Sequence, residues 1–311
     1  MKTVFFGTPV FAIPVLKKLI DNGHDVVGVF TGNGPIELEA KQLGIRIFKP
    51  TSLRKGDDIF EQFKFLNPDL CVVAAYGKII PSRYLNVPKY GFLNVHPSLL
   101  PKYRGPSPIQ TAILNGEANT GVTIMIVDEE VDHGPILASR EFPISNPPAS
   151  EQFSNHDELA KKLFELGAKL LIEIITKYVN GEIKPIPQDH SQATFTKIFT
   201  REDGRINWSE PAEKIYNQIR ALNPEPGAWT LLRLPGLGEQ SKIMNILTSQ
   251  IGCSRIVEEV PGTVVGIDGN VAVATKTCYL ILKQIQLEGG KEMDARSFVN
   301  GHPDFLNSKL E

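Results

Sequence analysis

Two polar side chains at the end of an apolar run have residue types and a spacing that could serve catalysis. Asn94 and His96 end the apolar part of the stretch GFLNVHPSLLPKYRGPSPIQ, residues 91–110. An amide offers N–H donors to a developing negative charge, and an imidazole exchanges a proton near neutral pH. Because the two are separated by one residue, both point to the same face of an extended strand. The alternative is a purely structural role, in which Asn94 caps a turn and His96 is a hydrogen-bonded core histidine.

The apolar run that carries this pair predicts a buried strand. Phe92, Leu93 and Val95 lie between Gly91 and Pro97, and such a bounded run is typical of a strand in a parallel sheet. Ligands of open α/β sheets bind at the carboxyl ends of the strands. The sequence therefore places Asn94 and His96 where a ligand would bind.

A second candidate group is the acidic segment at residues 128–132, which contains four carboxylates. It lies between two predicted strands, at 118–127 and 136–142, so it is expected to form a loop. A dense acidic run is often no more than a solvated loop. The pattern alone leaves open whether Asp132 belongs to a site.

The elements that position these groups alternate between strand and helix along the first half of the chain. Continuous apolar strands alternating with helices indicate a parallel sheet covered on both faces, which is an α/β, Rossmann-like, doubly wound fold. The turn Gly7-Thr8-Pro9 follows the first strand without a GxGxxG pattern, and no Walker A pattern occurs, so we exclude both nucleotide fingerprints. The predicted strands are 3–6, 25–30, 45–48 and 69–74, and the predicted helices are 11–22, 37–43, 57–66 and 155–180.

The remainder of the chain predicts a small β domain. Residues 181–206 lose periodicity and contain several prolines, which is typical of a connecting segment. A helix at 208–222 and five short strands between 228 and 287 favour a barrel of the OB type. We therefore predict a catalytic domain at 1–189, a linker at 190–205, and an OB-like β-barrel domain at 206–311.

Composition excludes several classes of protein. With 311 residues, 41% hydrophobic and 22% charged, the chain resembles an ordinary globular protein, and its net charge of -2 favours neither nucleic-acid nor membrane-surface binding. No run approaches a membrane span, and the N-terminus reads as a strand and turn. Cys71, Cys253 and Cys278 are far apart, which predicts reduced thiols, a cytoplasmic location and no zinc site.

Five motifs follow one another in an order that covers essentially the whole chain. They are FFGTPVFAIPVL at 5–16, VVAAYGKIIP at 72–81, FLNVHPSLLPKYRGPSPIQ at 92–110, VDHGPIL at 131–137 and ALNPEPGAW at 221–229. With these motifs the chain resembles the methionyl-tRNA formyltransferases, a branch of the folate-dependent formyltransferase family. The Asn-X-His pair, the SLLP motif and a downstream Asp are shared across that family.

The resemblance implies a site and its substrates. Asn94, His96 and Asp132 would be catalytic, with no metal. The co-substrate would be 10-formyltetrahydrofolate, the acceptor methionyl initiator tRNA, and the enzyme a monomer without membrane contact. The residues implied for the folate site are Ser98, Leu99, Leu100 and Pro101, together with Ala75, Tyr76 and Gly77.

The chain departs from that family after the second predicted strand. The family carries there a loop rich in Arg, Lys and Gly that contacts tRNA, whereas Thr31 is followed only by Gly32-Asn33-Gly34 before Pro35. Either the loop is lost or its residues are missing from the sequence. Residues 206–311 also hold ten Lys or Arg against twelve Asp or Glu, so they do not read as basic.

Three functions therefore compete on the sequence. The leading one is formyl transfer to methionyl-tRNA, the second is formyl transfer to a nucleotide-linked amino sugar, and the third is RNA binding without catalysis. Lys102 and Arg104 either contact acceptor phosphates or are solvated. His133, where the family more often has threonine, is interpreted as a loop residue.

Overall fold

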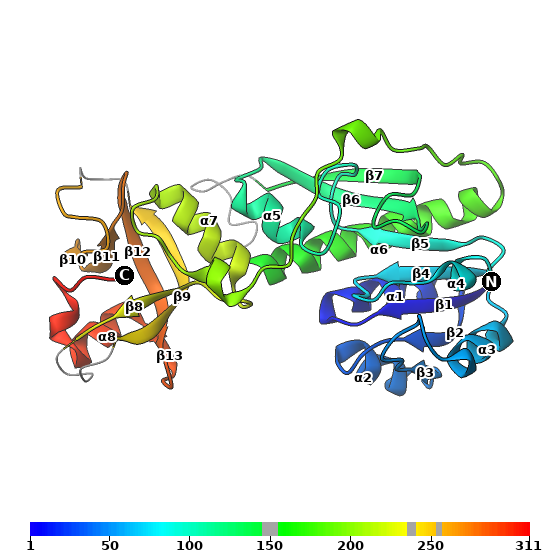
Figure 1. The fold of residues 1–311 in the computed structure, drawn as a ribbon, viewed down its shortest axis with the longest axis horizontal. Helices are drawn as coiled ribbons and strands as arrows, with labels where there is room; N and C mark the ends of the chain where they lie inside the picture. The colour runs from blue at the N-terminus through cyan, green and yellow to red at the C-terminus, as the bar shows by residue number, and fades with distance from the viewer. Residues whose placement is uncertain (145–154, 235–240, 253–256) are drawn as a thin grey trace. The chain divides into compact units, whose positions relative to one another are not determined.

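The computed structural model describes residues 1–144, 155–234, 241–252 and 257–311. The chain divides into two compact units, which Figure 1 shows in blue to green and in yellow to red. The first unit takes in Met1–Ile109 and most of residues 118–197, and the second holds Ile198–Glu311 with two short segments.

The first unit is built on a seven-stranded sheet with the order β3-β2-β1-β4-β5-β6-β7. The five strands from β3 to β5 are parallel, and β6 and β7 run antiparallel at one edge. The predicted strand with Asn94 and His96 is β5, an interior strand between β4 and β6. The bounds are β1 Lys2–Gly7, β2 Asp25–Phe30, β3 Ile47–Phe48, β4 Leu70–Ala74, β5 Phe92–His96, β6 Asn119–Ile126 and β7 Ile136–Pro143.

Helices α3 and α6 pack against opposite faces of this sheet. On one face, Phe63 of α3 lies 6.2 Å from both Phe6 and Phe92 between ring centroids. On the other, α6 approaches so closely that a Cβ on Gly167 would lie 2.5 Å from Val95 Cγ1, so only glycine fits there. The helices of this part of the chain are α1 Ile13–Asp21, α2 Pro35–Gln42, α3 Asp57–Leu66, α4 Ser82–Leu85, α5 Pro108–Leu114 and α6 His156–Val179.

The second unit is a curled antiparallel sheet with the order β10-β11-β12-β9-β8, and β13 pairs with β12. Its concave core holds Trp208, Ile246, Leu280 and Phe298 with α7 and α8. The last residues of the chain close the curl, because Leu310 bridges Leu232 of β8 and the adjacent Lys309 bridges Thr263 beside β10. The bounds are α7 Ala212–Leu222, β8 Trp229–Leu232, β9 Lys242–Gly252, β10 Val264–Ile267, β11 Asn270–Ala274, β12 Tyr279–Leu287, β13 Glu292–Asp294 and α8 Ala295–Gly301.

The predicted fold class, a Rossmann-like mostly parallel sheet followed by a small antiparallel barrel, is confirmed. Several details were wrong. The helix predicted from Trp208 begins at Ala212, because Pro211 has extended backbone and Trp208 is buried in the core instead. β13 and α8 were not predicted. Reduced thiols were expected throughout, but Cys278 is disulfide-bonded; Cys71 is free and buried, which raises its pKa, and Cys253 lies outside the described residues.

Closure of the second unit by its C-terminal residues gives a stability prediction. Leu310 is 2% exposed and belongs to the core of this unit. Leu310→Ala is expected to lower the free energy of unfolding by about 2 to 5 kcal/mol, because the truncation leaves a cavity. Denaturant unfolding followed by tryptophan fluorescence measures the loss. Lys309→Ala, whose side chain is exposed, is the control, and equal effects of the two changes would contradict the closing role of Leu310.

Candidate active site

Three sequence-predicted residues meet at the carboxyl end of β5. Asn94 Nδ2 donates to Asp132 Oδ1 over 3.3 Å, and His96 Nδ1 lies 3.5 Å from the same oxygen. Asn94 and His96 share one face of β5, as the strand period requires, and Asp132 comes from the loop between β6 and β7. The antiparallel pairing of β5 with β6 brings that loop beside β5, since Asn94 pairs with Met125 near the end of β6. One carboxylate oxygen therefore serves an amide and an imidazole together.

Asp132 Oδ2 and His96 Nε2 have hydrogen-bond partners outside the three residues. Asp132 Oδ2 accepts a hydrogen bond from the Gly105 N–H at 2.8 Å. The His96 ring is 4% exposed, and its Nε2 donates to the carbonyl oxygen of Tyr103 at 3.1 Å. A carbonyl and a carboxylate both accept and cannot donate, so a doubly protonated ring satisfies both neighbours. Both ring nitrogens of His96 therefore face protein acceptors.

The SLLP segment forms a tight turn directly after His96. Ser98 is fully buried; its Oγ donates to the carbonyl oxygen of Lys102, and its own carbonyl accepts from Thr123 Oγ1, each at 2.7 Å. The Leu100 N–H donates to the same Thr123 hydroxyl, and the Leu100–Pro101 peptide is cis. The Ser98 hydroxyl therefore shapes the loop, while Leu99 and Pro101 are partly exposed.

The other segment predicted to bind folate lies next to this turn in the sheet. Residues 75–77 follow β4, the parallel neighbour of β5, so both segments leave the sheet at the same edge. Ala75 has a φ of 50°, and Gly77 is exposed. Tyr76 is instead buried beside Phe6, and burial raises the pKa of its hydroxyl. The backbone around Ala75 and Gly77, rather than the Tyr76 ring, faces outward.

Arg104 is neither solvated nor exposed to an acceptor, so both interpretations of it from the sequence were wrong. It is 3% exposed, and its Nε and Nη2 donate to Gln188 Oε1 at 3.2 and 2.8 Å. The Gln188 amide in turn donates to the carbonyl oxygens of Asp132 and Gly134. A buried guanidinium requires such partners, and a neutral amide supplies them here. Lys102 is exposed.

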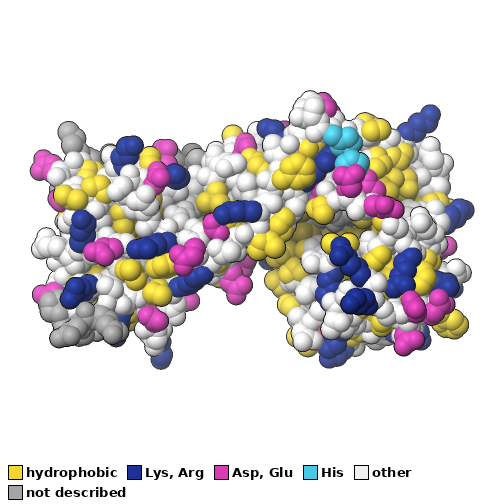
Figure 2. All heavy atoms as spheres, in the orientation of Figure 1, with side chains coloured by type: hydrophobic (Ala, Val, Ile, Leu, Met, Phe, Trp, Pro, Cys, Tyr) yellow, Lys and Arg dark blue, Asp and Glu magenta, His cyan; other side chains and the backbone are white. Residues whose placement is uncertain are grey.

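His133, next to Asp132, is part of a packed group. Its Nδ1 lies 2.7 Å from Asp128 Oδ2, and its ring stacks on His190 with centroids 4.0 Å apart. His190 Nδ1 accepts from Arg104 Nη2 at 2.8 Å. Figure 2 shows histidine and acidic side chains side by side on the face in view. His133 thus does more than occupy a loop, because it links the acidic segment to Arg104.

Sequence reasoning missed the segment that backs this site. Thr194 and Thr196 lie in residues predicted as linker, yet their backbones pair with Arg104 on both sides at 2.8 Å. Thr196 Oγ1 also accepts from the Ser107 N–H. A short run of threonines around Phe195 was the available signal for a strand-like pairing.

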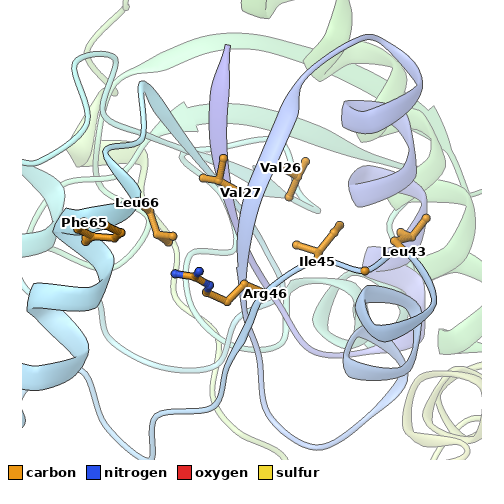
Figure 3. Close-up of a pocket in the computed structure, with 8 residues that line it drawn as sticks. Val26, Val27, Leu43, Ile45, Arg46, Phe65 and Leu66 are labelled. Carbon is orange, nitrogen blue, oxygen red and sulfur yellow. The ribbon is translucent and has the colours of Figure 1, made fainter.

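A separate pocket of about 570 Å³ opens near the amino ends of β2 and β3 (Figure 3). It lies at the start of β2 and before β3, and Figure 3 shows Arg46 beside the apolar side chains of Val27, Ile45 and Leu66. None of the predicted site residues lines it.

Within residues 1–144, 155–234, 241–252 and 257–311, no three His, Cys, Asp or Glu side chains gather as ligands of a metal ion would. In the same ranges, no helix has both the length and the apolar character needed to cross a membrane.

Comparison with known proteins places this geometry in a family. A model described as formyl transferase matches residues 1–175, and one described as formyl transferase, C-terminal domain, matches residues 198–303. The chain is 40% identical to a methionyl-tRNA formyltransferase of Roseiflexus sp. (strain RS-1), covering 97% of this chain and 92% of that protein. It is 39% identical to one from Sulfurihydrogenibium sp. (strain YO3AOP1) over 326 aligned positions, covering 100% of both.

Solved structures share the fold at lower identity. HypX from Aquifex aeolicus in complex with tetrahydrofolic acid aligns with a TM-score of 0.68 at 19% identity, over 96% of this chain and 47% of HypX, so the chain spans about half of that protein. The N-formyltransferase from Helicobacter canadensis, bound to folinic acid and dTDP-3-aminofucose, aligns with a TM-score of 0.66 at 18% identity, over 94% of this chain and 100% of that one. The resemblance predicted from the motifs is confirmed: this chain belongs to the formyl transferase family.

Proposed function

We propose that this protein transfers the formyl group of 10-formyltetrahydrofolate to the α-amine of methionyl initiator tRNA. The observation that carries the proposal is the carboxylate of Asp132, which contacts both Asn94 and His96 at the carboxyl end of β5. Relatives about 40% identical over nearly the whole chain are named methionyl-tRNA formyltransferases, which supports this acceptor. The reaction would take place in the cytoplasm, on a monomer.

The proposed role of Asn94 is to stabilise the oxyanion. Attack of the amine on the formyl carbon makes a C–N bond and a tetrahedral intermediate whose oxygen carries negative charge. Of the two N–H groups on the Asn94 amide, one donates to Asp132. The other has no partner among the described residues and is available to the oxyanion, where a fixed donor is most effective.

The proposed role of Asp132 and His96 is to take up the proton that the amine loses. Because both His96 nitrogens already face protein acceptors, we assign the proton to the Asp132–His96 pair and not to one member. The pair returns a proton to N10 of the folate as the N10–formyl bond breaks. The number of protons and electrons is then unchanged over the cycle.

The proposed folate site lies between residues 75–77 and 98–101. These segments follow two adjacent parallel strands, and ligands of α/β sheets bind at that edge. Leu99, Leu100 and Pro101 would offer apolar surface to the pterin, and the backbone of Ala75 and Gly77 would offer hydrogen bonds. The SLLP turn is held by Thr123 before any ligand binds, so the proposed site is preorganised.

We assign catalysis to a domain at residues 1–189 and RNA contact to a domain at residues 206–311, with a linker at 190–205 between them.

A second acceptor, a nucleotide-linked amino sugar, is favoured by the short turn after β2. There the Gly32 N–H donates to Thr8 Oγ1, and Lys49 Nζ donates to Asn33 Oδ1, so this turn is folded onto the sheet. The alignment with the Sulfurihydrogenibium relative has 326 positions, and this chain has 311 residues. The relative therefore has residues that this chain lacks.

The two acceptors are separated by a direct assay. The protein is incubated with 10-formyltetrahydrofolate and either methionyl-tRNA or an amino-sugar nucleotide, and formylated product is measured. We expect product with the tRNA only, and transfer to the sugar alone would overturn the proposal. We also expect modest tRNA affinity that falls steeply with salt, because phosphate contacts release counterions. Affinity unchanged between about 50 and 200 mM salt would contradict phosphate contacts as the main term.

A further inference from the structure

The side chain of Gln188 is buried between Arg104 and the loop that carries Asp132. It is 6% exposed, and its Nε2 donates to the carbonyl oxygens of Asp132 at 2.9 Å and Gly134 at 2.7 Å. Its Oε1 accepts both contacts from Arg104. Carbonyls only accept and a guanidinium only donates, so the neighbours fix which end of the amide is oxygen. Every hydrogen-bonding site of this amide is used.

Arg104 is itself held in place. Its N–H donates to the carbonyl of Thr194, its carbonyl accepts from Thr196, and its Nη2 also donates to His190. The next residue, Gly105, donates its N–H to Asp132 Oδ2. Gln188 therefore connects a rigid segment to the backbone of the loop that carries Asp132.

The loop at Asp132 needs such support. Asp132 has a φ of 50°, in the left-handed region that non-glycine residues occupy at a cost. At Gly134 a Cβ would lie 2.0 Å from the Ile126 carbonyl oxygen, so the loop also passes very close to β6. The two carbonyls that flank this strained turn are those that Gln188 binds. Released from Gln188, Asp132 can relax toward commoner backbone angles and leave Asn94 and His96.

We propose that Gln188, fixed by Arg104, is a positioning residue that sets the Asp132 carboxylate against Asn94 and His96. It acts through Asp132 and does not touch substrate. The inference rests on the proposed catalytic role of Asp132, and it adds to that role a residue 56 positions away in the chain.

The kinetic test compares Gln188→Ala and Gln188→Glu with Gln192→Ala. Gln188→Ala should lower kcat about 100-fold, the cost of a misplaced catalytic group, while KM for 10-formyltetrahydrofolate stays within about twofold. Gln188→Glu keeps the size and the acceptor for Arg104 but turns a carboxylate toward two carbonyls, so it should be at least as impaired. Gln192 is an exposed glutamine of the same segment that donates to Asp189, and its variant should match the wild type.

Two outcomes separate positioning from a structural role. In an Asp132→Asn background, Gln188→Ala should cost no more than about twofold further, because the group it positions is gone. A full additional 100-fold loss there, or a kcat within about threefold of wild type for Gln188→Ala alone, would overturn the proposal.

A readout without catalysis keeps this inference distinct from the proposed function. The Gly105 amide is protected by Asp132 Oδ2, so its hydrogen exchange, followed by NMR, reports where the carboxylate lies. Gln188→Ala should speed exchange at Gly105 about tenfold, and Gln192→Ala should not. Faster exchange in an enzyme that transfers no formyl group would leave the positioning intact and refute the function. Unchanged exchange in an active enzyme would refute the positioning alone.

Discussion

Asp132→Asn is expected to reduce turnover by about 10⁴-fold, by analogy with other His–carboxylate pairs. An asparagine that still accepts the Gly105 N–H must turn its own NH₂ group toward Asn94 and His96. Donors then face the Asn94 amide, and a protonated His96 loses its counter-charge. The variant should fold, because asparagine tolerates the positive φ at this position.

The measurement is the rate of formyl transfer at saturating donor and acceptor, with folate affinity measured separately by fluorescence. Folate affinity should stay close to that of the wild type. Asp69→Asn is a suitable control, since Asp69 accepts the Lys2 N–H at the amino end of β4, away from the site. If Asp132→Asn keeps more than about a tenth of the wild-type rate, Asp132 is a loop acid and the proton-transfer scheme fails.

Asn94→Ala is the second large change, with an expected loss in kcat of about 10² to 10³-fold. The substitution removes the N–H that is available to the oxyanion and the one that holds Asp132 Oδ1. Because the developing charge exists only in the transition state, kcat should fall and the KM for folate should move little.

Two further variants sharpen this result. Asn94→Asp preserves size but places a second carboxylate against Asp132, so it should be slower than Asn94→Ala. Asn22→Ala, at the exposed end of α1, removes an amide that donates to the Lys18 carbonyl and should leave the rate unchanged. A normal kcat with a raised KM for Asn94→Ala would assign Asn94 to ground-state binding instead.

The parts of the fold that the sequence specifies locally could be predicted from it. Strands such as 25–30 and 70–74 are continuous apolar runs, and α6 repeats buried leucines at helical spacing. β13 and α8 could not be found this way, because Glu292–Asp294 is a short exposed strand that pairs with β12 and has no apolar run of its own. The residues after Trp208 predicted a helix that includes it, but Trp208 precedes α7 and is buried in the core of the second unit.

The candidate site also has a part that local sequence patterns predict and a part that they do not. Asn94 and His96 are two apart on one strand, so local periodicity brings them together, and the motifs pointed to Asp132. The environment of Arg104 depends on Gln188, which is 84 positions away in a proline-rich stretch without periodicity. No local pattern distinguishes a buried guanidinium from a solvated one, because its burial depends on partners that only the folded chain brings together.

The pairing of residues 307–311 with the second unit also protects two sheet edges from other strands. β10 and β8 are the end strands of the sheet path. Asn307 donates its backbone N–H to Val264 of β10, and Leu310 bridges Leu232 of β8. An uncovered strand edge presents unpaired N–H and C=O groups that can pair with a strand of another chain. Loss of this segment should therefore favour association of the protein with itself as well as lowering its stability.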